Sequence, residues 1–251
     1  MKFKDIALPR EYGVWGLLAE AFLVGFCLAP TKAGLLLGFA ALSLFCFTQP
    51  AKGVLKNRSL TRGTLFFMLL YATLGLLALT QAAALSSAPF WRPMIAGLIL
   101  SLAQLMLDFK NQGRSFLSET AGGSAVSSLA AVILIAGGKP SGTAFAIWGL
   151  LCLRIFASVT YVRNKLRLAK GREYSPGQVF WVHGLALTLL LVFTRVHFVP
   201  WPVTLGFTAL CLNAALGMLK YQVPVKARTV GFQQMAFGIL YSLCIILGYW
   251  K

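Results

Sequence analysis

The sequence predicts an all-α fold, a polytopic transmembrane bundle of about nine helices that forms a single integral membrane domain over residues 1–251. Three observations predict it. Hydrophobic residues make up 58% of the chain and charged residues 12%, about half the charged fraction of a soluble domain. Apolar stretches of about 20 residues, the length that crosses a bilayer as a helix, recur along the chain. Basic residues cluster in every second gap between these stretches.

Polar, proline or glycine residues bound each apolar stretch. Pro50 predicts the end of the second helix, because proline has no N–H to donate to the preceding turn. Ser115 or Ser118 is a candidate N-cap of the fifth helix, and Glu119 suits its positive N-terminal end. The spacing Gly34-x-x-x-Gly38 and the small-residue run 121–125 indicate close helix packing. The predicted helices are, in order, 13–29, 33–48, 64–85, one that ends near 108, one that ends at 137, 143–162, 178–194, 201–219 and 231–249.

The basic residues predict the topology. Seventeen of the 23 Lys and Arg residues lie in the N-terminal segment and in the 2–3, 4–5, 6–7 and 8–9 gaps, five lie on the other side, and Arg154 lies within the sixth helix. Because loops rich in Lys and Arg stay in the cytoplasm, the N-terminus is predicted to be cytoplasmic and the C-terminus outside. The predicted location is the inner (cytoplasmic) membrane of a bacterium, with membrane lipids as the neighbours of the chain.

The net charge of +17 does not indicate a nucleic-acid partner. The basic residues lie beside apolar spans, where they set topology and contact lipid headgroups. The five cysteines lie inside apolar runs and none has the spacing of a metal ligand. The sequence therefore predicts no metal and no cofactor.

Two ionisable residues lie at membrane depth, where each costs a few kcal/mol. Glu20 and Arg154 are about 10 Å and 12 Å from the cytoplasmic ends of their helices, at a rise of 1.5 Å per residue. Opposite charges at matched depth predict a buried ion pair. Other polar side chains at similar depth predict a cavity open to the cytoplasmic side, with structural hydrogen bonding between helices as the alternative: Gln104, His183, Asn213, Gln233 and Gln234.

The basic segments predict an anion-binding rim, because Lys and Arg bind phosphate directly as point charges or bidentate forks. No Ser/His/Asp or Cys/His constellation supports nucleophilic catalysis, so no catalytic residue is assigned and enzymatic activity is left open. The candidate ligand-binding residues are Glu11, Glu20, Lys52, Lys56, Arg58, Arg114, Glu119, Arg154, Arg163, Arg167, His183 and Asn213.

Several segments together carry a family resemblance. They are 8–16 (Leu-Pro-Arg-Glu-Tyr-Gly-Val-Trp-Gly), the stretch from Arg114 to 122, and Arg154 with 161–167. In these segments the chain resembles the YwiC-like family of bacterial integral membrane proteins. The family opening typically reads Pro-Arg-Glu-His-Gly-x-Trp, and Tyr12 stands here in place of the histidine. The resemblance implies a multi-pass membrane protein and brings no defined activity.

A more distant resemblance is to the UbiA prenyltransferase superfamily. Residues 57–63, Asn-Arg-Ser-Leu-Thr-Arg-Gly, are similar to the segment that follows the first Asp-rich motif in many UbiA members. The resemblance implies nine helices and a substrate site that faces the 2–3 and 6–7 loops. UbiA enzymes hold Mg²⁺ with carboxylates in those loops, but here Lys52, Lys56 and Arg163 occupy them and no aspartate does. Magnesium-dependent diphosphate chemistry is therefore not expected.

The functional hypothesis from the sequence is binding of an anionic lipid or isoprenoid phosphate in a cytoplasm-facing cavity with a basic rim. Three alternatives stay open. They are a transporter of a small anion with Glu20 and Arg154 on its path, a divergent UbiA-like transferase, and an assembly factor for a membrane complex. The sequence shows no convincing inverted repeat, which disfavours the transporter. It does not predict the oligomeric state.

Overall fold

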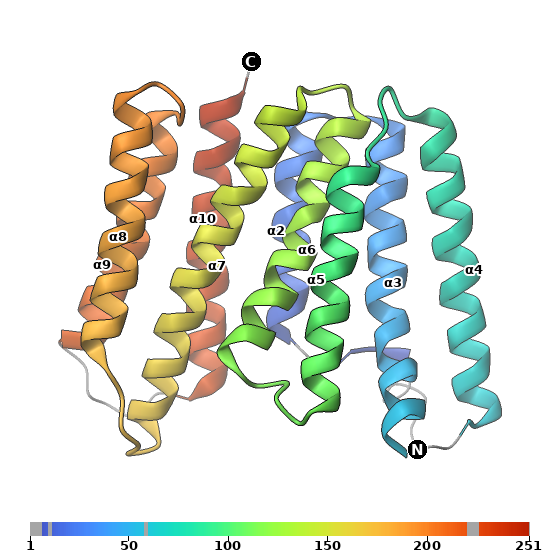
Figure 1. The fold of residues 1–251 in the computed structure, drawn as a ribbon, viewed down its shortest axis with the longest axis horizontal. Helices are drawn as coiled ribbons and strands as arrows, with labels where there is room; N and C mark the ends of the chain where they lie inside the picture. The colour runs from blue at the N-terminus through green and yellow to red at the C-terminus, as the bar shows by residue number, and fades with distance from the viewer. Residues whose placement is uncertain (1–6, 10–11, 58–59, 220–225, 251) are drawn as a thin grey trace.

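The computed structural model describes residues 7–9, 12–57, 60–219 and 226–250. In these residues the chain forms nine long α-helices and no strand, which confirms the predicted all-α class. Each helix runs antiparallel to the one before it, and α2 begins at the end of the bundle opposite to the one where α10 ends (Figure 1). The helices are α2 (Tyr12–Leu28), α3 (Lys32–Asn57), α4 (Arg62–Leu85), α5 (Trp91–Phe109), α6 (Phe116–Ala136), α7 (Ser141–Ala169), α8 (Pro176–Arg195), α9 (Trp201–Leu219) and α10 (Ala227–Tyr249).

The lengths and composition of the helices are those of a multi-pass membrane protein. Eight of the described helices are long and apolar enough to cross a membrane, and the apolar part of α2 (Gly13–Leu28) is shorter. The 17 residues of α2 still rise about 25 Å at 1.5 Å per residue. That length is close to the ~30 Å thickness of the hydrocarbon core, and α2 lies among the other helices (Figure 1).

Helix α6 lies at the centre of the bundle, packed against α2, α3, α5 and α7. Its small residues allow this, because neighbouring backbones and side chains approach closely. A Cβ on Gly123 would lie 2.7 Å from Cγ2 of Ile155 on α7. A Cβ on Gly34 of α3 would lie 3.0 Å from Cγ2 of Ile133 on α6. The close packing predicted from the small-residue runs is confirmed.

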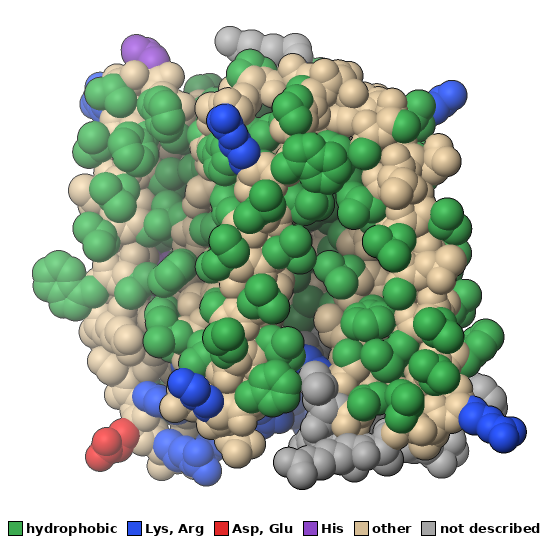
Figure 2. Space-filling view, turned by 45° about the vertical axis from the view of Figure 1, so that its right-hand side comes forward, with side chains coloured by type: hydrophobic (Ala, Val, Ile, Leu, Met, Phe, Trp, Pro, Cys, Tyr) green, Lys and Arg blue, Asp and Glu red, His purple; other side chains and the backbone are tan. Residues whose placement is uncertain are grey.

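The flank of the bundle is apolar and its charges lie at the two rims. Figure 2 shows hydrophobic side chains over the whole visible flank, with Lys and Arg at the upper and lower edges. In a membrane this flank faces lipid tails. Large apolar side chains more than half exposed include Leu69, Leu76, Ile99, Met106, Leu185, Leu205 and Leu247.

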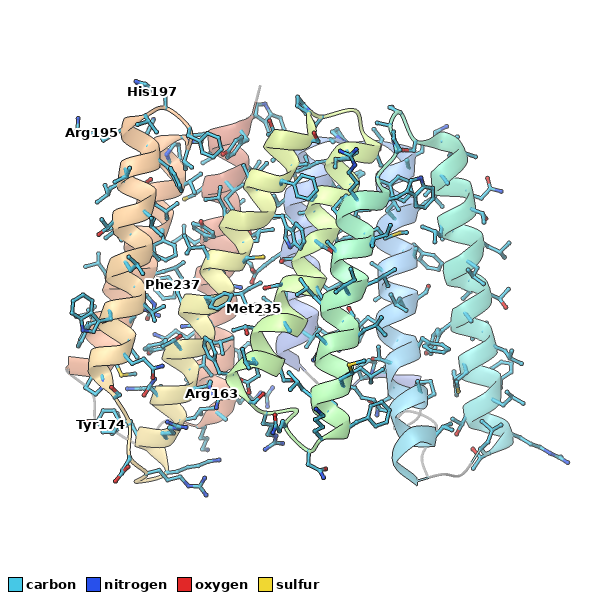
Figure 3. All side chains as sticks on the ribbon, viewed as in Figure 1. Arg163, Tyr174, Arg195, His197, Met235 and Phe237 are labelled. Carbon is cyan, nitrogen blue, oxygen red and sulfur yellow. The ribbon has the colours of Figure 1, made fainter. Side chains whose placement is uncertain are left out.

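One end of the bundle carries most of the described Lys and Arg residues, and we call it the basic end. There α3, α5, α7 and α9 finish and α4, α6, α8 and α10 begin. Arg163 and Tyr174 lie near this end in Figure 3, whereas Arg195 and His197 lie at the opposite end. The Lys and Arg residues of the basic end whose side chains are described are Lys52, Arg62, Lys110, Arg114, Arg163, Lys165, Arg167, Lys170, Arg172, Lys226 and Arg228. Those of the opposite end are Lys32, Arg92, Lys139 and Arg195.

The second helix does not end at Pro50, so that prediction is wrong. Helix α3 continues through Pro50 to Asn57. A proline removes only one hydrogen bond of the ladder, and membrane helices tolerate the loss where side chains and neighbours stabilise the backbone. In the turn before Pro50, the hydroxyl of Thr48 donates to the carbonyl of Phe45 at 2.6 Å. Pro50 itself is buried. Lys52 and Lys56 therefore belong to a helix and not to a loop.

The sixth helix also extends past its predicted end near residue 162, because α7 continues to Ala169. Its last turns bury Tyr161 in a small core with Val179, Ala214 and Met218. The ammonium group of Lys165, 4% exposed, donates to the carbonyl of Gly217 at 2.7 Å. That carbonyl is among the last four of α9, which have no partner inside their own helix, so a cation at this position is stabilising.

Candidate functional site

The predicted ion pair between Glu20 of α2 and Arg154 of α7 is present in the middle of the bundle. Nη1 of Arg154 lies 2.9 Å from Oε2 of Glu20, and Nη2 donates to Oε1 at 3.0 Å. The two side chains are only 3% and 5% exposed. A fork of this kind is the strongest geometry for a carboxylate and a guanidinium, and it accounts for two charges at membrane depth.

Helix α10 contacts the ion pair between Glu20 and Arg154. Nη2 of Arg154 also donates to the backbone carbonyl of Gln234 at 2.9 Å. One turn later, Gly238 faces the pair so closely that a Cβ there would overlap Nη2 of Arg154 and Oε1 of Glu20. The pair therefore ties α2, α7 and α10 together. Beside it is a cavity of about 10 Å³, the size of about one water molecule, which is too small for a substrate or lipid group.

None of the other polar side chains predicted at membrane depth lines either of the two cavities formed by the described residues. Nδ1 of His183 donates to the carbonyl of Val179 on its own helix at 2.8 Å. Oδ1 of Asn213 accepts a hydrogen bond of 2.5 Å from Nε2 of Gln233 on α10. Counting residues from a helix end gives depth but not direction around the helix axis, and these side chains face different neighbours. The alternative interpretation, hydrogen bonding within and between helices, describes them better.

A polar cavity of about 130 Å³ lies at the basic end, between the first turn of α6, the end of α7 and the start of α8. Its lining combines two guanidinium groups with hydroxyl and amide groups and one aromatic ring. Thr160, Arg163, Asn164 and Arg167 recur at helical spacing and so share one side of α7. The lining residues are Phe116, Thr160, Arg163, Asn164, Arg167 and Gln178.

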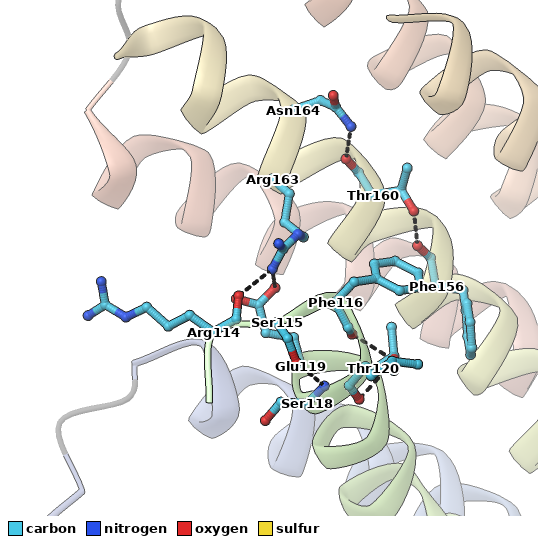
Figure 4. Close-up of polar contacts among 11 residues, drawn as sticks. Arg114, Ser115, Phe116, Ser118, Glu119, Thr120, Phe156, Thr160, Arg163 and Asn164 are labelled. Carbon is cyan, nitrogen blue, oxygen red and sulfur yellow. Dashed lines mark hydrogen bonds and ion pairs between the residues drawn. The ribbon is translucent and has the colours of Figure 1, made fainter. Parts of the chain in front are cut away.

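Arg163 is positioned by the segment that leads into α6 (Figure 4). Its Nη1 donates to the backbone carbonyl of Arg114 at 2.6 Å and to Oε2 of Glu119 at 3.1 Å. Both contacts use the same nitrogen, and no hydrogen bond of Nη2 or Nε is found among the described residues. Arg163 is therefore held in place with donor groups left for a further acceptor.

The remaining polar groups of the lining are ordered by local hydrogen bonds. Nδ2 of Asn164 donates to the carbonyl of Thr160 at 2.9 Å, and Oδ1 accepts from the N–H of Ser175 at 2.8 Å. The second contact ties the loop before α8 to α7. The hydroxyl of Ser175 caps α8 by accepting from the N–H of Gln178. The wall formed by α7 and α8 is thus prearranged by the fold.

The start of α6 matches the predicted capping. Ser115 is the N-cap residue and its hydroxyl accepts from the N–H of Ser118, while Glu119 lies in the first turn. Arg114, a predicted ligand-binding residue, contributes its backbone carbonyl here and its side chain points away from Arg163 (Figure 4). Among the candidate residues whose side chains the structure describes, Arg163 and Arg167 line the cavity at the basic end.

Of the candidates between the second and third predicted helices, Lys52 lies away from this cavity. Lys52 forms an ion pair with Asp108 at 3.5 Å, which links the end of α3 to the end of α5. Lys56 belongs to α3, but its side chain is outside the described part of the structure. Glu11 and Arg58 also lie outside the described residues. Of the basic rim predicted from both loops, the part that the structure shows at the cavity is formed by Arg163 and Arg167 of α7.

Four lining residues were not predicted from the sequence: Phe116, Thr160, Asn164 and Gln178. The segment after residue 162 was expected to be a loop, and a loop gives no shared helix face. A helical reading would have placed Thr160, Asn164 and Arg167 on one side by their spacing of three and four residues. Phe116 and Gln178 come from other helices, and spacing within α7 carries no signal for them.

A family model described as YwiC-like protein matches residues 8–134. The chain belongs to the YwiC-like family. No curated protein and no solved structure matches the chain. The matched span of this YwiC-like protein contains Glu20 and Glu119, whereas Arg154, Arg163 and Arg167 lie beyond it. Both the buried ion pair and the basic-end cavity are therefore assembled between the matched part of the YwiC-like chain and the helices that follow.

Proposed function

We propose that this YwiC-like membrane protein binds an anionic lipid or an isoprenoid phosphate at the basic-end cavity. The observation that supports the proposal most strongly is the pair of arginines, Arg163 and Arg167, in the lining of one polar cavity. Guanidinium groups bind phosphate oxygens through paired N–H donors and need no metal ion to do so. Arg163 is half-buried and held by Glu119, so less conformational entropy is lost when a ligand binds.

The position of the cavity favours an amphiphile. The basic end lies at the edge of the apolar flank, where phospholipid headgroups meet the hydrocarbon tails. Phe116 lines the cavity and packs edge-on against Phe156 of α7, with ring centroids 5.7 Å apart. Phe156 is 43% exposed on the flank. An apolar surface therefore continues from the polar cavity toward the region where a lipid tail would lie.

We propose further that the basic end faces the cytoplasm of a bacterial cell and that the protein lies in the inner membrane. The support is the excess of Lys and Arg at this end. A C-terminal fusion to alkaline phosphatase should then be active and a C-terminal fusion to green fluorescent protein dark, because α10 ends at the opposite end. The reverse pattern would show the orientation to be wrong.

Native mass spectrometry of the protein purified in mild detergent tests the proposed ligand class. The wild type should retain an acidic lipid or a polyprenyl phosphate. Replacing Arg163 and Arg167 together with glutamine should reduce that adduct about tenfold or more, the change expected for the loss of one charge-assisted hydrogen bond or more.

Two single-residue controls separate the cavity from surface charge in that experiment. Arg172→Gln removes an exposed charge at the basic end, and Arg195→Gln removes one at the opposite end. Neither residue lines the cavity, so both variants should retain the adduct at the wild-type level. A wild type without any acidic adduct, or a double variant that keeps it undiminished, contradicts the proposal.

A further inference from the structure

We infer that the cavity at the basic end is specific for a terminal phosphate monoester, and so for a lipid whose headgroup is a bare phosphate. The inference rests on the proposed function and narrows its ligand class. Three properties of the cavity support it: its volume, the charge of its lining and the arrangement of its donor groups.

The volume limits the headgroup. A cavity of about 150 Å³ holds one benzene ring, which has six heavy atoms. The basic-end cavity, at about 130 Å³, is slightly smaller. A phosphate group has five heavy atoms and fits this space, whereas a phosphoglycerol headgroup has about twice as many. Ligand sites for whole drug-sized molecules are usually about 300–1,000 Å³. The space therefore suits a phosphate group better than a whole phosphoglycerol headgroup.

The charge of the lining suits a dianion. Among the described residues that line the cavity, the charged ones are Arg163 and Arg167, and both are cations. Glu119 contacts Arg163 from outside the lining and engages only Nη1. A phosphate monoester carries a charge of about −1.5 to −2 at pH 7, whereas a phosphodiester carries a charge of about −1. The Coulomb attraction to the two guanidinium groups is correspondingly larger for the monoester.

Side chains that carry donor groups line the cavity from two helices. Arg163, Asn164 and Arg167 lie on α7, and Gln178 lies on α8 on the other side of the loop that Asn164 fixes. A monoester presents three terminal oxygens to such a ring of donors. A diester presents two and directs its fourth oxygen into a further substituent. A lining with donor-bearing side chains on two helices therefore fits a terminal phosphate better than a phosphate that carries a second substituent.

The test compares lipids in nanodiscs that contain the full-length protein. One arm contains phosphatidic acid, and the other contains phosphatidylglycerol at the mole fraction that matches the surface charge. Native mass spectrometry should show phosphatidic acid retained about tenfold or more over phosphatidylglycerol, the difference expected for one further charge-assisted hydrogen bond. The Arg163→Gln/Arg167→Gln variant should lose this preference, while Arg172→Gln should keep it.

The other outcomes distinguish the inference from the proposed function. Equal retention of both lipids, lost in the double variant, overturns the monoester inference and leaves the proposed function in place. Retention of neither lipid, or retention that the double variant does not change, overturns both. A third arm adds inorganic phosphate at the same concentration as phosphatidic acid. Displacement of the lipid in that arm shows that the site takes free phosphate, which overturns the lipid part of the proposal.

Discussion

Replacing Glu20 with glutamine should lower the free energy of unfolding by about 3 kcal/mol, near the lower end of the range for breaking one partner of a buried ion pair. The amide keeps the size of the side chain but leaves the Arg154 guanidinium buried and uncompensated at 3% exposure. Thermal unfolding in detergent, together with reversible unfolding in a denaturing detergent, measures the loss.

Two comparisons identify the cause of that loss. Glu119→Gln makes the same chemical change in a half-exposed pair with Arg163, where the expected effect is below about 1 kcal/mol. The double replacement Glu20→Leu/Arg154→Met removes both charges and should recover most of the stability, because apolar residues of similar volume replace buried ion pairs well. A Glu20→Gln variant as stable as the wild type contradicts a buried, mutually dependent pair.

Replacing Gly238 with alanine should destabilise the protein by about 2 kcal/mol or more, within or above the usual range for overpacking a tight core. The new methyl group would overlap Nη2 of Arg154 and Oε1 of Glu20. The pair or α10 must then move, and the hydrogen bond from Arg154 to the carbonyl of Gln234 weakens with it. The midpoint of thermal unfolding measures this effect.

Gly231→Ala is the matched control on the same helix. A Cβ on Gly231 would meet nothing within 4 Å, so alanine there should be neutral or stabilise by about 0.5–1 kcal/mol through its helix propensity. Equal effects of the two substitutions would show that Gly238 is not specifically fitted to the ion pair.

The sequence predicts the fold class and the buried pair because both depend on properties that can be read within single helices and loops. Apolar length and the alternation of charge give the number and direction of the helices. Depth, counted from helix ends, is enough to match Glu20 with Arg154, since two opposite charges in hydrocarbon must find each other. The structure shows the two groups in contact, with Nη1 of Arg154 2.9 Å from Oε2 of Glu20.

Depth along a helix does not predict which neutral polar side chains share a cavity, because that depends on the rotation of each helix and on its neighbours. His183 and Asn213 lie at suitable depths, but neutral polar groups can be satisfied by their own helix or by any adjacent one. Their depth therefore says little about what they face. Charged groups have fewer alternatives, which is why depth succeeded for the ion pair alone.

The basic-end site was predicted in part. Arg163 and Arg167, which line the cavity, were among the predicted candidates, but as members of a loop. Pro50 and the charges after residue 162 suggested helix ends, and in both places tertiary packing extended the helix further. The extension of α7 sets Thr160, Asn164 and Arg167 on one face, and only the approach of α6 and α8 turns that face into a cavity.

The most direct test of an anionic lipid site at the basic end is photo-crosslinking in nanodiscs. The probe is an anionic phospholipid with a photoreactive group beside its phosphate, and peptide mass spectrometry locates the adducts. We expect adducts within residues 114–120 and 160–178, and their loss in the Arg163→Gln/Arg167→Gln variant. Adducts concentrated at the opposite end, near Arg92, Lys139 and Arg195, or adducts that persist unchanged in the double variant, would contradict the proposed site.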